Sequence, residues 1–380
     1  MKPLHIPRRA GAVLLAAGTL WAAAVTAGSE SAAAAAKALW AAAPIGVLRW
    51  ETGDLWRRDG LSAATALAVG EAPLLRAARP AVARLLAQPE PEVAESGGAD
   101  GTTEPLEETP LDTPAAQDNG VPAKTLIPTD PSGYTVCGKV YISSSSGYTL
   151  SPEEIAQPFS ARLADEGPQL LILHTHGSES YTPASGTAVW SGDHRTTDNR
   201  YNVVAVGDAM AEVFAENGIS VLHDRTLYDY PSYAGAYDRA LVSIQKYLQQ
   251  YPSIHFILDV HRDAIEDGQG GQYKVISAID GVGDAAQLSI VVGSDGGGLT
   301  HPNWMENLRL AAAIQEKMLT DYPTLLRPVL LRASRYNQHA TTGSLLVEVG
   351  AAGNSPEEAA LSGRLFAREM AQVLLHAGED

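Results

Sequence analysis

The sequence predicts an α/β fold, in which a central, mostly parallel or mixed sheet is flanked by helices. From about residue 130 to the C-terminus, short apolar runs of strand length alternate with segments of helical periodicity, and this alternation is typical of α/β domains. Hydrophobic residues make up 45% of the 380-residue chain, which is enough for a large core. A single cysteine excludes an internal disulfide and any cysteine-rich zinc module.

Each expected element follows from a local pattern. Continuous apolar runs rich in β-branched residues predict the strands, and apolar residues at three- and four-residue spacing predict the helices. The expected strands are 135–142, 170–175, 220–224, 255–260, 273–279, 287–292, 329–332 and 345–349. The expected helices are 203–214, 237–248, 304–318 and 357–375.

The N-terminal third predicts a tether ahead of this domain. Lys2, Arg8 and Arg9 precede a charge-free run from Ala10 to Gly28, which is close to the roughly 20 apolar residues that span a bilayer. Residues 1–28 are therefore expected to be a membrane anchor with its basic end in the cytoplasm. A cleaved signal peptide is the alternative, because small residues end the run.

Two segments connect the anchor to the domain. Residues 29–87 are rich in Ala, Leu and Arg and predict a helical stalk. Gln88 to Pro122 holds nine acidic residues, six prolines and no basic residue, so it has little apolar surface to bury. We expect a disordered linker over 88–129 and a folded domain over 130–380.

Charge excludes one class of partner. The chain carries 27 Lys and Arg against 44 Asp and Glu, a net charge of −17. Nucleic-acid binding depends on a basic surface that neutralises phosphates, so no nucleic-acid partner is expected.

Three expected strands end in side chains that suit a metal site. The first runs into His176 and Glu179, the second into His261 and Arg262, and the third into Glu348. In an α/β sheet, ligands bind beyond the carboxyl ends of the strands. Catalytic zinc takes three His or carboxylate ligands and leaves a position for water. We therefore expect Zn²⁺ on His176, Glu179 and His261, with Glu348 as general base.

Simpler interpretations stay open at this stage. His261 could be a histidine paired with Asp259 or Asp263, and Glu348 could be an ion-pair partner of Arg262 or Arg335. His174 is the rival ligand, because it lies two residues before His176 and shares its face if the strand continues.

The sequence resembles the stage II sporulation protein P family of endospore-forming bacteria. Six segments carry the resemblance in order: LILHTHGSESY (171–181), NVVAVG (202–207), LDVHRDA (258–264), HPNWMENL (301–308), YNQ (336–338) and LLVEVGAAGNSPEEA (345–359). By these motifs, His176 and His261 match the essential histidines of the family. Glu179 matches their acidic partner, and Glu348 matches the late glutamate.

The resemblance implies a zinc-dependent N-acetylmuramoyl-L-alanine amidase that acts on peptidoglycan, also with endopeptidase activity. It implies the fold of zinc amidases and carboxypeptidase-like enzymes. It further implies a membrane-anchored enzyme, outside the cytoplasm at the sporulation septum, working during engulfment beside stage II sporulation proteins D and M.

The expected reaction is hydrolysis of the amide between the lactyl group of muramic acid and L-Ala. Glu348 would move the proton, and Arg262, next to His261, would steady the oxyanion or a substrate carboxylate. A metallo-endopeptidase that cuts stem-peptide cross-links is the enzymatic alternative. A non-catalytic scaffold that binds the cell wall at the septum is the alternative from another class.

Overall fold

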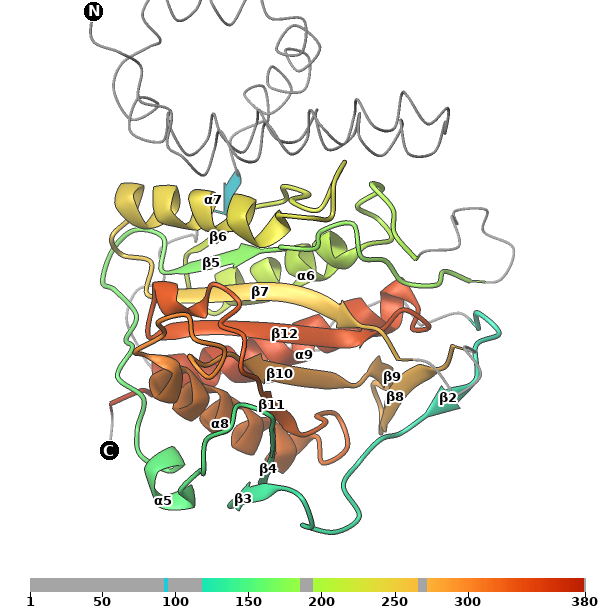
Figure 1. Cartoon of the computed structure of the whole chain (residues 1–380). Helices are drawn as coiled ribbons and strands as arrows, with labels where there is room; N and C mark the ends of the chain where they lie inside the picture. The colour runs from blue at the N-terminus through green and yellow to red at the C-terminus, as the bar shows by residue number, and fades with distance from the viewer. Residues whose placement is uncertain (1–91, 95–117, 185–193, 266–271, 379–380) are drawn as a thin grey trace, which may run out of the picture. The chain divides into compact units, whose positions relative to one another are not determined.

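The computed structural model describes residues 92–94, 118–184, 194–265 and 272–378, all within one compact unit, Glu90–Asp380 (Figure 1). The anchor and stalk predicted for 1–87 lie outside the described residues. Of the linker predicted for 88–129, residues 92–94 and 118–129 are described. No helix among the described residues has the length and apolar character needed to cross a bilayer.

A mixed sheet forms the centre of the described unit. Its strand order is β1-β6-β5-β7-β12-β10-β11-β4-β3. The bounds are β1 Glu92–Ala94, β3 Thr135–Cys137, β4 Val140–Ser144, β5 Leu170–Leu173, β6 Val221–His223, β7 Phe256–Asp263, β10 Leu288–Val292, β11 Val329–Leu331 and β12 Gly343–Ala351. Strands β6, β5, β7 and β12 run parallel, whereas β10 runs antiparallel to β12. The predicted fold class, a mostly parallel or mixed sheet with flanking helices, is confirmed.

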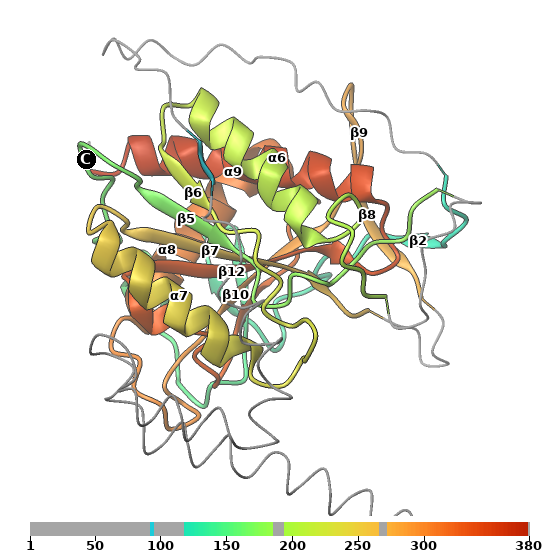
Figure 2. The ribbon, with the colours of Figure 1, turned by 90° about the horizontal axis from the view of Figure 1, so that it is seen from above.

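Helices cover both faces of this sheet. They are α5 Pro152–Ile155, α6 Val203–Glu216, α7 Ala236–Gln250, α8 Trp304–Asp321 and α9 Pro356–Leu375, with a 3₁₀ turn, η1, at Gln338–Ala340. Helices α6 and α9 lie on one face and α7 lies on the other (Figure 2). The four long helices match the predicted ones.

Successive side chains along the strands contribute alternately to two apolar cores, one on each face of the sheet. Leu258, Val260 and Val347 belong to the large apolar cluster that includes α6, α8 and α9. Ile257 and Leu171 belong to the smaller cluster under α7. Successive side chains of a strand point to opposite faces. His261 follows Val260 and Glu348 follows Val347, so the side chains of His261 and Glu348 lie on the α7 face.

The structure differs from the predicted strands in two places. The run predicted as one strand, 135–142, is a hairpin of β3 and β4, because Gly138 adopts a left-handed turn with φ 57°. The strand predicted at 273–279 is β8, Lys274–Ile279, and it leaves the main sheet. It pairs instead with β9, Gly283–Ala286, and with β2, Ala123–Lys124, in a separate three-stranded sheet.

The last residues ahead of the domain contact this small sheet. Strand β2 pairs in parallel with β8. The buried Asn119 donates hydrogen bonds from Nδ2 to the carbonyls of Thr182 and Gly353. Residues 118–124 are thereby held against the domain, next to the segment that follows β12.

Candidate metal centre

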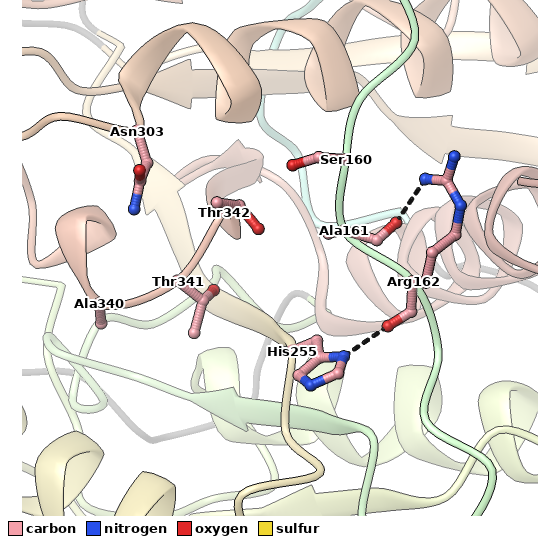
Figure 3. Close-up of a pocket in the computed structure, with 8 residues that line it drawn as sticks. All are labelled: Ser160, Ala161, Arg162, His255, Asn303, Ala340, Thr341 and Thr342. Atoms are coloured by element: carbon pink, nitrogen blue, oxygen red, sulfur yellow. Dashed lines mark hydrogen bonds between the residues drawn. The ribbon is translucent and has the colours of Figure 1, made fainter.

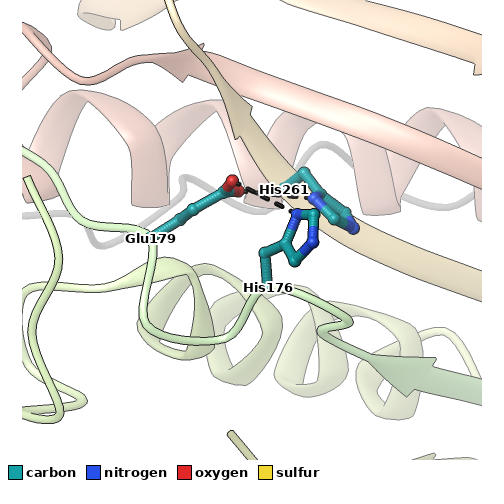
Figure 4. Close-up of side chains that lie close together, drawn as sticks. All are labelled: His176, Glu179 and His261. Carbon is teal, nitrogen blue, oxygen red and sulfur yellow. Dashed lines mark ion pairs between the residues drawn. The ribbon is translucent and has the colours of Figure 1, made fainter. Parts of the chain in front are cut away.

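The carboxyl ends of β5 and β7 bring the three predicted ligands together. His176 follows β5 by three residues, Glu179 lies one turn later, and His261 is near the end of β7. Their side chains converge from the two segments (Figure 4). One potential ligand atom from each residue lies within 4.8 Å of the other two, and all three residues are buried. The structure thus brings together the three residues that the sequence singled out as ligands.

The spacing of the donor atoms suits a small cation. Nδ1 of His176 lies 3.5 Å from Oε1 of Glu179, and Nδ1 of His261 lies 3.3 Å from Oε2. A tetrahedral ion with bonds of about 2.1 Å separates its ligand atoms by about 3.4 Å. Two imidazoles and a carboxylate are also the donor set that zinc prefers. The residues present therefore fit Zn²⁺.

Electrostatics favour a negative charge on Glu179 and a positive charge close to it. Burial opposes ionisation of the Glu179 carboxyl, but contacts with His176 and His261 outweigh it and keep its pKa well below the ordinary value. Burial likewise opposes the charge on His261. Asp259 and Glu179 outweigh that effect and raise the pKa of His261 well above the ordinary value. Without an ion, a proton on His261 supplies the positive charge that the carboxylates attract.

Asp259 supports His261 from behind. Its Oδ1 lies 2.9 Å from Nε2 of His261, on the side away from Glu179. The same carboxylate accepts hydrogen bonds from the backbone N–H (2.8 Å) and hydroxyl (2.6 Å) of Thr175, in the segment that leads to His176. A carboxylate behind a ligating histidine fixes its orientation and tautomer. The sequence signal for this role is the two-residue spacing, which puts both side chains on one face of β7.

Glu348 lies beside the cluster on the next strand. It is in register with His261 across the parallel pair β7 and β12. Burial raises the pKa of Glu348 to about 8, although His261 acts in the opposite direction. Its buried Oε2 has no hydrogen-bond partner. The ion pairs with Arg262 or Arg335 that the sequence left open are not formed within the described residues.

The structure directs Arg262 away from the interior of the cluster. Its guanidinium donates to backbone carbonyls, from Nε to Ser180 (3.2 Å) and from Nη2 to His194 (3.0 Å). Its backbone N–H donates to Oε2 of Glu179 at 3.3 Å. Arg262 is thus a brace between β7 and the segment that carries Glu179.

His174, the rival ligand, lies on the opposite face. Its Nδ1 is 3.0 Å from the carbonyl of Val260, and its Nε2 is 2.8 Å from Nε2 of His223. His223 in turn lies 2.9 Å from Asp208 of α6. Burial lowers the pKa of His174 to about 3, so its ring is neutral. His174 therefore lies outside the cluster of His176, Glu179 and His261.

A second polar group anchors the segment between the ligands. Asp229 accepts hydrogen bonds from the backbone and hydroxyl of Ser178 and pairs with Arg195 at 2.5 Å. Arg195 also lies 3.6 Å from Oε1 of Glu179. Asp229 had no signal in the sequence, whereas Arg195 lies in the polar run 193–202, which suits either substrate binding or helix capping.

Tyrosines form one wall of the site. The ring of Tyr233 stacks on His176 with centroids 4.5 Å apart, and Tyr237 meets His176 edge-on at 5.4 Å. Tyr336 lies 5.9 Å from Tyr237. Tyr233 is 57% exposed, so this wall connects the cluster with solvent.

An open hollow of about 480 Å³ lies elsewhere, at the amino ends of β7 and β12 (Figure 3). Polar residues dominate its lining: Ser160, Arg162, His255, Asn303, Thr341 and Thr342. None of the proposed ligands lines it. The chemistry of the metal cluster, rather than the size of this hollow, identifies the candidate site.

Solved structures of cell-wall amidases show a distant likeness to the chain. The amidase AmiC2 of Nostoc punctiforme is 14% identical with a TM-score of 0.34, covering 55% of this chain and 98% of its own. The CwlD amidase of Clostridioides difficile, in complex with the GerS lipoprotein, is 15% identical with a TM-score of 0.32 (54% and 94%). The amidase Ami1 of Mycobacterium smegmatis is 12% identical with a TM-score of 0.35 (56% and 99%). Scores this low carry no argument about activity.

No curated protein matches the chain significantly. A family model does match, over residues 102–371, which is more than two thirds of the 380 residues. The matched region includes every residue of the cluster and Glu348. The chain therefore belongs to the family of stage II sporulation protein P (SpoIIP).

Proposed function

We propose that this protein is a zinc-dependent peptidoglycan hydrolase, an N-acetylmuramoyl-L-alanine amidase that removes stem peptides from glycan strands. The observation that carries the proposal is the buried His176–Glu179–His261 cluster, with Glu348 in register beside it and its Oε2 buried without a partner. Membership in the SpoIIP family supports a cell-wall substrate in sporulation.

The residues divide the chemistry between them. His176, Glu179 and His261 would hold Zn²⁺, which supplies Lewis acidity towards the amide carbonyl and acidifies water. In its ionised form, Glu348 would accept the proton of the attacking water at Oε2 and deliver it to the departing nitrogen of L-Ala. Burial makes Oε2 a stronger base than an exposed carboxylate.

Two residues position the others. Asp259 orients His261, and Arg262 ties β7 to the segment that carries Glu179 through the carbonyls of Ser180 and His194. These contacts favour a positioning role for Arg262 over direct contact with substrate. Replacement of Arg262 by Lys would then weaken zinc binding as well as turnover.

The test is digestion of purified sacculi by the full-length, zinc-loaded protein, with mass analysis of the released fragments. An amidase releases whole stem peptides with a free N-terminal L-Ala. Fragments cut within the cross-links would instead support the metallo-endopeptidase alternative. If no fragments are released and the protein binds no stoichiometric zinc, the result supports the non-catalytic scaffold.

Single substitutions test the role of the metal ligands and the role of the general base separately. His176→Ala is expected to lose zinc and activity, whereas His376→Ala, at an exposed position near the C-terminus, retains both. Glu348→Gln is expected to keep zinc and to lose turnover by about 10²–10⁴-fold. If Glu348→Gln loses zinc, Glu348 is a ligand and the assignment of the base is wrong.

We propose the cellular setting from the resemblance. The protein would act outside the cytoplasm at the sporulation septum, beside stage II sporulation proteins D and M. Co-purification of the full-length protein with these two proteins from sporulating cells tests the partnership.

A further inference from the structure

Arg327 carries a buried guanidinium with two unused donors. It precedes β11, and only 9% of its surface is exposed. Nη1 pairs with Oδ2 of Asp263 at 2.8 Å. Nε and Nη2 are buried and have no hydrogen-bond partner. Because arginine stays charged at all ordinary pH values, unpaired buried donors of this kind are costly and call for a ligand.

The two unused donors lie on the same edge of the guanidinium. Nε–H and the outer N–H of Nη2 point in parallel, which is the fork that accepts both oxygens of a carboxylate. Asp263 pairs with the other terminal nitrogen, so neither donor of this fork is used by that ion pair. The geometry therefore suits a planar, bidentate anion.

This fork lies next to the proposed base. The strands follow one another in the order β7-β12-β10-β11. Arg327 precedes β11, and its side chain pairs with Asp263 at the end of β7. The side chain therefore extends along the end of the sheet near Glu348, which lies on β12. Both members of the pair act on Glu348, since Asp263 raises the pKa of its carboxyl and Arg327 lowers it. Oε2 of Glu348 is also buried and without a partner. Three unsatisfied polar atoms thus gather at one place.

We propose that Arg327 is the anchor of an anion subsite, which binds a carboxylate of the peptide part of the substrate through Nε and Nη2. The inference rests on the proposed function and adds the recognition of the leaving peptide. A carboxylate fits better than a phosphate, because the Asp263 carboxylate already pairs with the guanidinium and repels a dianion more strongly than a monoanion.

The test compares two small substrates on the full-length, zinc-loaded protein. N-acetylmuramoyl-L-Ala-D-Glu carries free carboxylates, and its diamide carries none. The wild type is expected to have a KM for the diamide about ten- to hundred-fold higher, as loss of a charge-assisted hydrogen-bonded pair implies. Arg327→Met is expected to remove this preference by raising the KM of the acid, so that the KM values of the two substrates become about equal.

Two further variants control for folding and for charge. Arg327→Lys keeps a cation for Asp263 but has no planar fork, so it is expected to fold and to show a reduced preference. Arg332→Met removes an arginine just after β11 whose Nη1 bonds to Ser145, and it is expected to keep the full preference. A preference that survives in Arg327→Met and Arg327→Lys overturns the subsite. An equal fall in kcat on both substrates with an unaltered ratio of their KM values overturns it too, because Arg327 would then act only on Glu348.

Measurements of peptide binding test this inference independently of the proposed function. If the wild type hydrolyses neither substrate, the proposed function fails. Calorimetric titration with L-Ala-D-Glu and with its diamide still decides the subsite. Tighter binding of the acid by the wild type, lost in Arg327→Met, supports it, and equal binding of both peptides refutes it.

Discussion

Burial governs the acid–base behaviour of individual residues in the site. Glu348 and Glu179 are both buried carboxyls on the same side of the sheet, yet their pKa values move in opposite directions. Glu179 contacts two imidazoles, which stabilise its charge. Glu348 has an unpartnered oxygen, so desolvation dominates. One carboxyl is thereby suited to hold a cation and the other to hold a proton.

The raised pKa of Glu348 predicts a pH-dependent stability of the metal-free protein. The folded state keeps a proton up to about pH 8, whereas the unfolded chain loses it near the ordinary value of 4.5. This contribution to stability is complete below pH 4.5 and is lost as the pH rises through about 8. Relative to Glu348→Gln, the unfolding free energy of the wild type should fall between pH 5 and pH 8 by on the order of 1 kcal/mol or more.

Urea unfolding with a chelator present measures this difference at each pH. The glutamine variant serves as the reference, because its side chain does not titrate. If the unfolding free energies of the two proteins change with pH in the same way, Glu348 is not desolvated in the folded state.

Asp259 offers a second test at the level of one residue. The Asp259→Asn substitution removes the charge behind His261 and leaves its shape, so zinc affinity should fall about ten- to hundred-fold. Competition with a chelator measures the change. Asp284→Asn, at an exposed position on β9, removes the same charge elsewhere and should leave zinc affinity unaltered. Equal affinities in both variants would remove Asp259 from the metal site.

At the scale of elements, α6 depends on a glycine to approach the sheet. A Cβ at Gly207 would lie 2.5 Å from Nε2 of His223 and 2.6 Å from Nε2 of His174. Those two imidazoles are themselves paired at 2.8 Å, so neither can move away without breaking that contact. The helix can therefore pack at this depth only with glycine at this position.

The substitution Gly207→Ala is accordingly expected to destabilise the fold by about 1–3 kcal/mol through overpacking, despite the better helix propensity of alanine. Chemical denaturation of the full-length protein measures the effect. Glu216→Ala, at the exposed end of the same helix, should change stability little. A neutral or stabilising Gly207→Ala would show that the His174–His223 pair is not held against α6.

At the scale of the whole molecule, the chain combines a folded unit with a long N-terminal part of different composition. The acidic stretch from Gln88 to Pro122 alone contributes nine of the 44 acidic residues. The net charge of −17 over the whole chain opposes binding of nucleic acid.

The predicted anchor gives a test at this scale. Deletion of residues 1–28 should move the protein from the membrane fraction to the soluble fraction, because no other run in the sequence matches its length and apolar character. N-terminal sequencing of the mature full-length protein separates the two alternatives. A start at Met1 supports an anchor, and a start near residue 28 supports a cleaved signal peptide. Membrane retention of the deletion variant would contradict both.

The sequence by itself determined the α/β class, the four long helices and the three metal-ligand candidates. These features depend on local patterns, since apolar periodicity predicts an element and the residues that end a strand predict what lies at the edge of a sheet. His176, Glu179 and His261 could be grouped for that reason before any coordinates.

Only the tertiary structure decided the features that depend on contacts between distant segments. It placed His174 on the opposite face with His223, turned Arg262 towards backbone carbonyls, and set Arg327 beside Glu348. It also split 135–142 into a hairpin at Gly138. Burial and partnership arise from packing between elements far apart in the chain, so the raised pKa of Glu348 and the unused fork of Arg327 have no signature in local sequence.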